Sequence, residues 1–420
     1  MHDMPSETVL FAQKHMRKRL LLRLVCTALA TLLLQPTLAA SQARPAGQTP
    51  PPNSVEASLW ALSDKAEIEA KRAGQLIKDE KLNAYINQVR CKIANDYCKD
   101  LRVYLMARPA FNASMAPNGY MEVWSGLLLR AETEAQLAFV LAHETAHFQE
   151  SHSIEAWRNL RSKANWALGL SMVAGAAGAP SYVGDLIYLG TIASVFGFSR
   201  ENETQADVIG FERAVNAGYD PKDAPAIWRS LIAEAAASDF DAVRKREARS
   251  GIFNTHPVST ERAAKLDALT KAIAANAPPN AAPAASSEDP RVAYRNQIRP
   301  FLSTWLRDEL RRRDYGQTQL LLTRLKSQGA DMGVLTFFEG ELLRLRRKPG
   351  DLEAAQKAYT QAITHADAPA DAWRELADAY VRTGEKAKAQ EALTLYLTKA
   401  PEAPDKELVM SRIERLKAGS

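Results

Sequence analysis

The segment His143-Glu144-Thr145-Ala146-His147 holds the residues of this sequence that are best suited to catalysis. Positions i and i+4 of a helix share a face, so both imidazoles can reach one metal ion. Glu144 is offset around the helix and can activate a water molecule for attack. Zinc peptidases use this pattern, although a helix with two incidental histidines would show the same spacing. The segment therefore predicts a zinc cofactor, Zn²⁺, with one ion per chain.

A catalytic zinc site normally has a third protein ligand besides two histidines. His152 is too close to His147 and falls on a different face of the helix. The acids Glu201, Glu203 and Asp207 lie near the start of a later predicted helix. By spacing alone, Glu201 and Glu203 compete as the third ligand, and an exposed acidic helix start would look the same. Asp207, one turn after Glu203, could orient a histidine ligand from behind.

The elements that must position these residues are mostly helical. One helix is predicted to begin near Thr133 with a capping-box pattern, and another runs from about Ser199 to Gly218. A helical pattern also covers 57–94. Short strands are predicted over Val103–Met106 and Met121–Trp124. The fold class predicted for this part is therefore α+β, mostly helical with a small sheet.

A second motif resembles that of a known family. Ser199-Arg200 followed by Glu203-Thr204-Gln205-Ala206-Asp207 is similar to the Ser-Arg and Glu-x-x-Ala-Asp segment of the HtpX-like HExxH metallopeptidases, which include the CAAX prenyl proteases. The resemblance implies a zincin-like peptidase domain with Glu203 as the third metal ligand. It also implies that Asp207 is a catalytic acid. We favour an orienting role for Asp207, because Glu144 can shuttle the proton alone.

The resemblance extends over roughly residues 60–270. Phe111-Asn112-Ala113 resembles the family's edge strand, which could bind an extended substrate by backbone pairing. Thr255-His256-Pro257, with Arg262 after it, resembles the family's later Thr-His-Pro segment. His256 could be a fourth metal ligand that gates the site, or it could hydrogen-bond a nearby loop. His256 and Arg262 are also candidates for stabilising the oxyanion.

An uncharged stretch over 164–184 lies between the two predicted metal-binding helices. Glycines and a proline interrupt it. We therefore expect residues 164–198 to form a loosely helical lid over the site, with a membrane-dipping segment as the alternative. The interruptions also disfavour a membrane-embedded peptidase, while contact with a membrane surface stays open.

The N-terminus is typical of an exported protein. A basic start at Arg17–Arg23 precedes an apolar core over Leu24–Leu34, and small residues follow. Residues 1–43 are therefore predicted to be a signal peptide, with an uncleaved anchor as the alternative. Export predicts a periplasmic location. In that oxidising compartment Cys91 and Cys98 could form a disulfide instead of remaining free thiols.

Beyond the signal peptide, the sequence predicts two domains and a linker. Residues 44–271 form the peptidase domain, and the Ala- and Pro-rich residues 272–292 form the linker. Residues 293–420 are helical with a period of 34, seen for example between Ala355 and Ala389. This period predicts a tetratricopeptide-repeat-like α-helical domain, with a generic helical bundle as the alternative.

The charge balance limits the class of partner. Without residues 1–43 the chain has 49 basic and 47 acidic residues, which argues against nucleic acid. Together with the resemblance, this predicts a periplasmic zinc endopeptidase that acts on unfolded or misassembled envelope proteins, in quality control or outer-membrane protein assembly. The repeats could contact the outer-membrane assembly machinery. The alternative is a periplasmic chaperone or assembly factor with a latent zinc site, against which the intact Glu144 argues.

Overall fold

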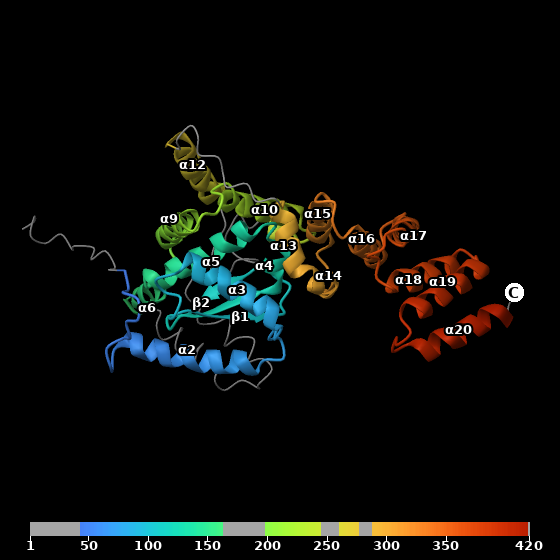
Figure 1. Cartoon of the computed structure of the whole chain (residues 1–420), viewed down its shortest axis with the longest axis horizontal. Coiled ribbons are helices and arrows are strands. Elements are labelled where there is room, and N and C mark those ends of the chain that lie inside the picture. The colour runs from blue at the N-terminus through green and yellow to red at the C-terminus, as the bar shows by residue number, and fades with distance from the viewer. Residues whose placement is uncertain (1–42, 163–197, 245–259, 277–287, 419–420) are drawn as a thin grey trace, which may run out of the picture. The chain divides into compact units, whose positions relative to one another are not determined.

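The computed structural model describes residues 43–162, 198–244, 260–276 and 288–418 (Figure 1). Residues Arg44–Ser420 form one compact unit. The helices are α2 (Val55–Arg72), α3 (Glu80–Ile93), α4 (Ser125–Arg130), α5 (Glu134–Gln149), α6 (His152–Ser162), α9 (Arg200–Asn216), α10 (Asp223–Ala237), α11 (Asp241–Arg244), α12 (Thr260–Asn276), α13 (Pro290–Ile298), α14 (Leu302–Arg311), α15 (Tyr315–Lys326), α16 (Met332–Arg346), α17 (Asp351–Ala362), α18 (Asp371–Arg382), α19 (Lys386–Lys399) and α20 (Lys406–Ala418). The strands are β1 (Arg102–Met106), β2 (Ala113–Met115) and β3 (Tyr120–Trp124). The chain is therefore mostly helical with a small sheet, as the sequence predicts.

Several predicted features lie wholly or almost wholly outside the described residues. They are the signal peptide over 1–43, the lid over 164–198, and His256. In the parts of the chain that the structure describes, no helix is both long enough and apolar enough to cross a membrane.

The three strands form one sheet in the order β1-β3-β2. Strand β3 pairs in parallel with β1 and antiparallel with β2. The strands predicted over 103–106 and 121–124 are confirmed to within one residue. The segment Phe111–Ala113, which resembles the family's edge strand, leads into β2: the Asn112 carbonyl accepts from the Trp124 N–H over 3.0 Å, and the paired register with β3 runs from Ala113 to Met115.

The two faces of the sheet contact different helices. Side chains alternate along β3, so Met121 and Val123 enter the main core with residues of α3 and α5. Tyr120 points to the other face and packs against Ala66 and Ala70 of α2. Figure 1 shows α2 along one side of the sheet and α5 on the other. The sheet thus forms a layer against which the buried helix α5 is held.

Helix α5 is buried almost along its whole length. It begins after Thr133, whose Oγ1 accepts a hydrogen bond of 3.1 Å from the backbone N–H of Gln136. The predicted capping box is only half formed, because the Gln136 side chain accepts from the backbone N–H of Glu132 instead of Thr133. The apolar run from Leu137 to Ala142 faces neighbours on every side. Surrounding elements therefore fix the position of this helix.

The helical pattern over 57–94 corresponds to two helices, α2 and α3. Between them the chain leaves the helix and pairs briefly with β1, where the Ile77 N–H donates to the Leu105 carbonyl over 2.8 Å. Cys91 in the last turn of α3 and Cys98 beyond it form the predicted disulfide. The loop it closes carries Asp96, which forms an ion pair of 2.8 Å with Arg213 of α9.

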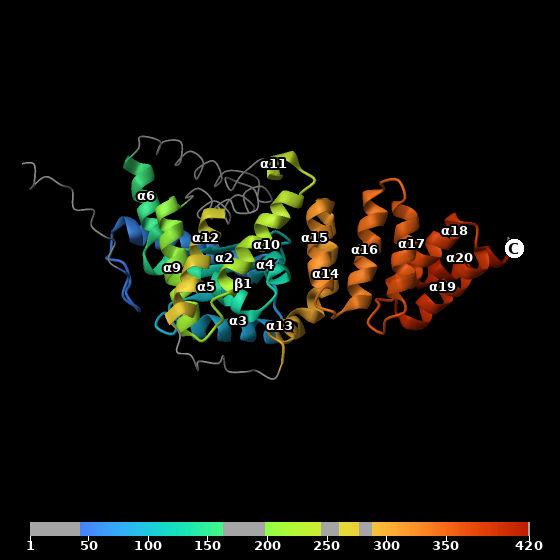
Figure 2. The same ribbon diagram turned by 90° about the horizontal axis from the view of Figure 1, so that it is seen from above.

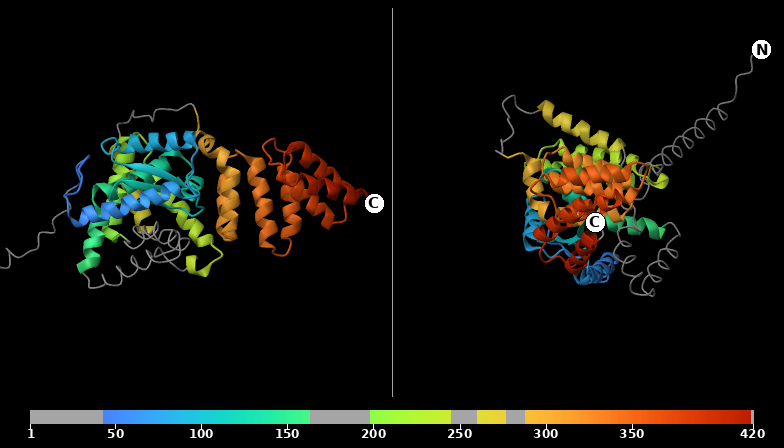
Figure 3. Two further views of the ribbon diagram at one scale, coloured as in Figure 1. Left: turned by 90° about the horizontal axis from the view of Figure 1, so that it is seen from below. Right: turned by 90° about the vertical axis from the view of Figure 1, so that its right-hand side faces the viewer.

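Helices α14 to α20 follow one another as neighbours (Figures 2 and 3). Trp373 of α18 is only 6% exposed, and Ala377, Ala389 and Leu393 are fully buried beside it. Such burial of small and large residues between antiparallel helices fits the repeat prediction. The assignment as tetratricopeptide repeats, the linker over 272–292 and the other domain boundaries stay predictions.

A buried ion-pair cluster joins helices from both predicted domains. The Arg130 guanidinium, 1% exposed, lies 2.6 Å from Glu234 of α10 and 2.7 Å from Glu309 of α14. Arg312 pairs with Glu309, and Arg324 of α15 pairs with Glu234 over 2.8 Å. We call this group the Arg130 cluster. It joins α14 and α15 to α4 and α10, which lie within the first predicted domain.

Candidate metal centre

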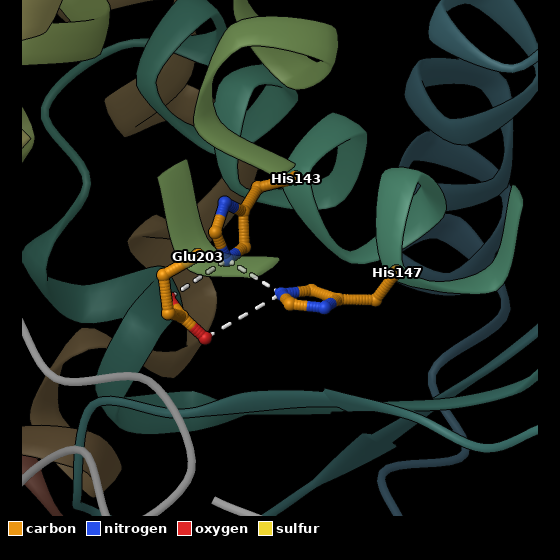
Figure 4. A group of neighbouring side chains, drawn as sticks. All are labelled: His143, His147 and Glu203. Carbon is orange, nitrogen blue, oxygen red and sulfur yellow. Dashed lines mark hydrogen bonds and ion pairs between the residues drawn. The ribbon is translucent and has the colours of Figure 1, made fainter. Parts of the chain in front are cut away.

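His143 and His147 of α5 and Glu203 of α9 converge on one point (Figure 4). The two imidazole Nε2 atoms are 3.1 Å apart. Each is 3.6 Å from a carboxylate oxygen of Glu203. All three side chains are at most 2% exposed. Within the described part of the chain, this is the group of His, Cys, Asp and Glu side chains that could hold a metal ion.

The spacing of these donor atoms fits a zinc ion. Ligands about 2.0–2.1 Å from a tetrahedral zinc lie about 3.3 Å from one another. The observed separations of 3.1 and 3.6 Å lie on either side of that value. Two histidines and one glutamate also form a ligand set found in catalytic zinc sites, which keep the fourth position for water or substrate.

A close approach of α9 to α5 brings Glu203 to the histidines. Gly210 permits it, because a Cβ at that position would lie 2.7 Å from the backbone nitrogen of His143. Helix α9 starts at its predicted place, with the Ser199 Oγ accepting from the Asn202 N–H. In this register Glu203 is buried and Glu201 is exposed. The geometry thus favours Glu203 over the competing Glu201.

Asp207 holds His143 from behind. Its Oδ1 lies 3.1 Å from Nδ1 of His143, on the ring edge away from the metal-facing Nε2. Arg262 of α12 binds the same carboxylate through Nε at 2.6 Å and Nη2 at 2.7 Å. Burial by itself would raise the pKa of Asp207, but the Arg262 charge and hydrogen bonds lower it to about 2. Asp207 is therefore an ionised acceptor for His143, which is the orienting arrangement favoured from sequence.

Arg262 also contacts the third member of the cluster. Its Nη1 lies 2.6 Å from Oε2 of Glu203, and its guanidinium stacks over the Trp228 ring at 5.1 Å. Burial lowers the pKa of Arg262, but the neighbouring charges of Asp207 and Glu203 raise it overall. The guanidinium thus faces two carboxylates, a different position from the oxyanion role considered from sequence.

A further buried acid lies near the three candidate ligands. Glu144 is 2% exposed, and it too raises the pKa of Arg262. Buried charges are usually paired or coordinate a metal ion, so acidic side chains beside two histidines are suited to a divalent cation.

Two aromatic rings contact His147 away from its metal-facing nitrogen. Phe198 stacks on its ring at a centroid distance of 4.0 Å. His152, fully buried, places Nδ1 at 2.9 Å from Nδ1 of His147. Burial lowers the pKa of His152. The two metal-facing histidines thus have different supports, a carboxylate behind His143 and an imidazole behind His147.

Sequence reasoning dismissed His152 as a metal ligand and missed this contact. On a straight helix, the spacing of five residues between His147 and His152 would place the two side chains on different faces. Their contact therefore requires the helix to end between them. Helix α5 ends at Gln149, and Ser151 takes a left-handed backbone conformation with φ of 56°. This turn brings His152 back over His147.

The site residues lie within a stretch that matches a known family. Residues 76–270 match the family model described as peptidase family M48. This part of the chain is therefore similar to the metallopeptidases of family M48. The match begins in the segment between α2 and α3 and ends within α12, so it includes both metal-site helices and Arg262.

Named relatives agree with the family. The chain is 28% identical over 213 residues to the beta-barrel assembly-enhancing protease of Escherichia coli K12, covering 48% of this chain and 42% of that protein. It is 28% identical over 197 residues to the putative beta-barrel assembly-enhancing protease of Vibrio cholerae, covering 44% and 39%. It is 31% identical over 188 residues to the mitochondrial metalloendopeptidase OMA1 of Schizosaccharomyces pombe, covering 44% and 51%. The matches span about half or less of each relative's length.

Proposed function

We propose that this chain is a zinc-dependent endopeptidase that cleaves proteins of the bacterial envelope. The convergence of His143, His147 and Glu203 within the stretch that matches family M48 carries this proposal. The metal would be held by the two imidazole Nε2 atoms and one oxygen of Glu203, with one zinc ion per chain. When bound, zinc polarises a scissile carbonyl and lowers the pKa of water at the fourth position.

Glu144 is the proposed general base. It follows His143 directly on the buried helix α5, and it lies close enough to Arg262 to raise that group's pKa. Its carboxylate takes a proton from the attacking water and passes it to the leaving amine. Asp207 keeps the His143 ring oriented and Arg262 holds the second oxygen of Glu203, so both residues position the site without touching substrate.

Strand β2 is the proposed binding site for the substrate backbone. It pairs with β3 on one side only, which makes it an edge of the described sheet, and it packs beside α5. An extended polypeptide can add to such an edge through main-chain hydrogen bonds, with little dependence on its sequence. This mode suits a peptidase that acts on unfolded segments.

The proposed location is the periplasm. The Cys91–Cys98 disulfide supports an oxidising compartment, and the basic and apolar start of the sequence supports export. Relatives named beta-barrel assembly-enhancing proteases support a substrate class of unfolded or misassembled envelope proteins. Helices α16 to α20, if they are tetratricopeptide repeats, would offer a surface for partners such as the outer-membrane assembly machinery.

Cleavage of casein tests this proposal. The mature protein should cleave casein, lose activity with a zinc chelator and regain it when zinc is returned. Glu144→Gln should bind zinc as well as the native protein but lose activity by a factor of about 10²–10⁴. A zinc-loaded protein that cleaves neither casein nor unfolded envelope proteins would favour the chaperone alternative.

A further inference from the structure

The ring of His152 connects His147 to a series of hydrogen-bonded side chains that leads away from the candidate metal centre. His152 Nδ1 contacts His147 Nδ1 at 2.9 Å, and its other nitrogen, Nε2, lies 3.3 Å from Oε1 of Gln205. The Gln205 amide nitrogen then donates to Oε2 of Glu150 over 2.8 Å. These residues come from three places, the end of α5, the start of α6 and the middle of α9.

The direction of the hydrogen bonds in this series follows from Glu150, the member farthest from His147. An ionised Glu150 can only accept, so the Gln205 amide group must donate to it and present its oxygen to His152. His152 then carries its proton on Nε2 and leaves Nδ1 as an acceptor. Because the two Nδ1 atoms contact each other and that of His152 accepts, the proton between them must be on Nδ1 of His147. That tautomer leaves Nε2 of His147 without a proton, as a metal ligand requires.

We propose that His152 is a positioning residue for the metal, which holds His147 in the tautomer and orientation that present Nε2 to zinc. Gln205 and Glu150 set the hydrogen bonds of His152 in turn. The inference rests on the proposed zinc site, because only a metal on Nε2 makes this tautomer necessary. It gives His147 an outer support of a different kind from the Asp207 carboxylate behind His143.

Burial and packing favour a positioning role over a simple core histidine. His152 is fully buried, and both of its ring nitrogens have polar partners of matching donor or acceptor type. Phe198 stacks on His147 and also lies 6.1 Å from the His152 ring, so these rings have little freedom to turn. A histidine that only filled space in the core would not need an acceptor nitrogen directed at Nδ1 of His147.

Zinc affinity of the full mature protein tests the proposal, measured by competition with a chromogenic chelator. His152→Leu removes the acceptor and should weaken zinc binding by about 10–100-fold. His152→Asn places an oxygen near the lost Nδ1 and should restore most of that affinity. Gln205→Leu should have a smaller effect, because Gln205 lies at the surface and acts through His152.

Thr145→Val is the matched control. Thr145 is equally buried on α5, and its hydroxyl donates to the Leu141 carbonyl within the same helix. This variant should bind zinc like the native protein. The unfolding temperatures of the metal-free variants show whether a loss of zinc affinity comes from a less stable fold. His152→Asn and His152→Leu should differ far more in zinc affinity than in unfolding temperature.

Nitrogen NMR of the zinc-loaded protein gives a second readout. His152 should show a protonated Nε2 and a bare Nδ1. A proton on Nδ1 of His152, or equal zinc affinity of His152→Leu and the native protein, would overturn the positioning role alone. A native protein that binds no zinc would instead overturn the proposed function, and the positioning role with it.

Discussion

Two buried arginines in this protein each lie between two carboxylates, yet only one of them lies beside the candidate metal ligands. Arg130 lies between Glu234 and Glu309, and Arg262 lies between Glu203 and Asp207. The Arg130 cluster also includes Arg312 and Arg324. Arg324 pairs with one further acid, Glu132, over 2.7 Å.

The difference separates a cluster that joins helices from the candidate metal centre. Around Arg130, three guanidinium groups face three carboxylates, and these side chains come from helices of both predicted domains. Arg262 also pairs with two carboxylates, but one of them, Glu203, lies 3.6 Å from both His143 and His147. The same motif thus joins helices in one place and lies beside the candidate metal ligands in the other.

Removing the helices that contact the Arg130 cluster from the second predicted domain should have the largest effect on stability. A chain that ends at residue 289 loses Glu309 from Arg130, together with Tyr294 and Leu302, which are buried in the main core. We expect a loss of at least about 5 kcal/mol, comparable with the whole stability of a domain. A chain that ends at residue 328, after α15, should stay folded and bind zinc.

Chemical denaturation and zinc content of the two truncated chains test this expectation. Equal unfolding midpoints for both would show that α13 to α15 do not belong to the peptidase core, and would favour the linker predicted over 272–292. The structure leads us to expect the opposite, since the Tyr294 hydroxyl donates to the Leu128 carbonyl and both residues are buried.

Replacing each arginine with methionine tests the comparison directly. In the zinc-free protein, Arg130→Met and Arg262→Met should each cost about 3–5 kcal/mol, because each removes a buried guanidinium from between two buried carboxylates. Zinc should then raise the unfolding temperature of Arg262→Met by more than it raises that of the native protein. For Arg130→Met, zinc should give only the native increment.

An exposed arginine serves as the control for both substitutions. Arg229 pairs with Asp267 at the surface, where both side chains are more than a third exposed. Arg229→Met should change stability by less than about 1 kcal/mol. If zinc raises the unfolding temperature of Arg130→Met and Arg262→Met equally, Arg262 does not influence the candidate metal centre.

Asp207→Asn should have a smaller, pH-dependent effect. Arg262 lowers the pKa of Asp207 to about 2, so the ionised group stabilises the fold at neutral pH by about 2 kcal/mol. A depressed pKa means that this contribution is complete above the ordinary aspartate range and is lost as pH falls towards 2. The unfolding temperatures of the metal-free native and variant proteins should therefore differ steadily from pH 7 to about 5 and converge below about 4.

Zinc binding gives Asp207→Asn a second readout. Losing the carboxylate behind His143 should weaken zinc affinity by about 10–100-fold at neutral pH. A constant difference in unfolding temperature down to pH 3, or unchanged zinc affinity, would contradict the orienting role of Asp207.

Local patterns in the sequence were enough to predict the central part of the fold. The i, i+4 spacing of His143 and His147 places both imidazoles on one helix face, and two of the three strands follow from alternation and turn signals. The convergence of Glu203 on the histidines could not come from spacing, which left Glu201 as a competitor. It depends on how closely α9 approaches α5, which Gly210 permits.

Long-range and turn-dependent contacts were out of reach. Arg262 meets Asp207 across 55 positions of sequence, and no periodic pattern connects them. His152 reaches His147 only because the chain turns at Ser151. The Arg130 cluster was missed for the same reason, since Glu309 lies 179 positions away on a helix assigned to another domain.

Zinc content is the most direct test of the metal site itself. The native protein, Glu203→Ala and Glu201→Ala should be purified in parallel and their bound zinc measured by elemental mass spectrometry. Glu201 is exposed on the same turn of α9, so it matches Glu203 in chemistry but not in position. The account predicts one zinc per chain in the native protein and in Glu201→Ala, and none in Glu203→Ala. Stoichiometric zinc in Glu203→Ala, with zinc lost from Glu201→Ala, would contradict it.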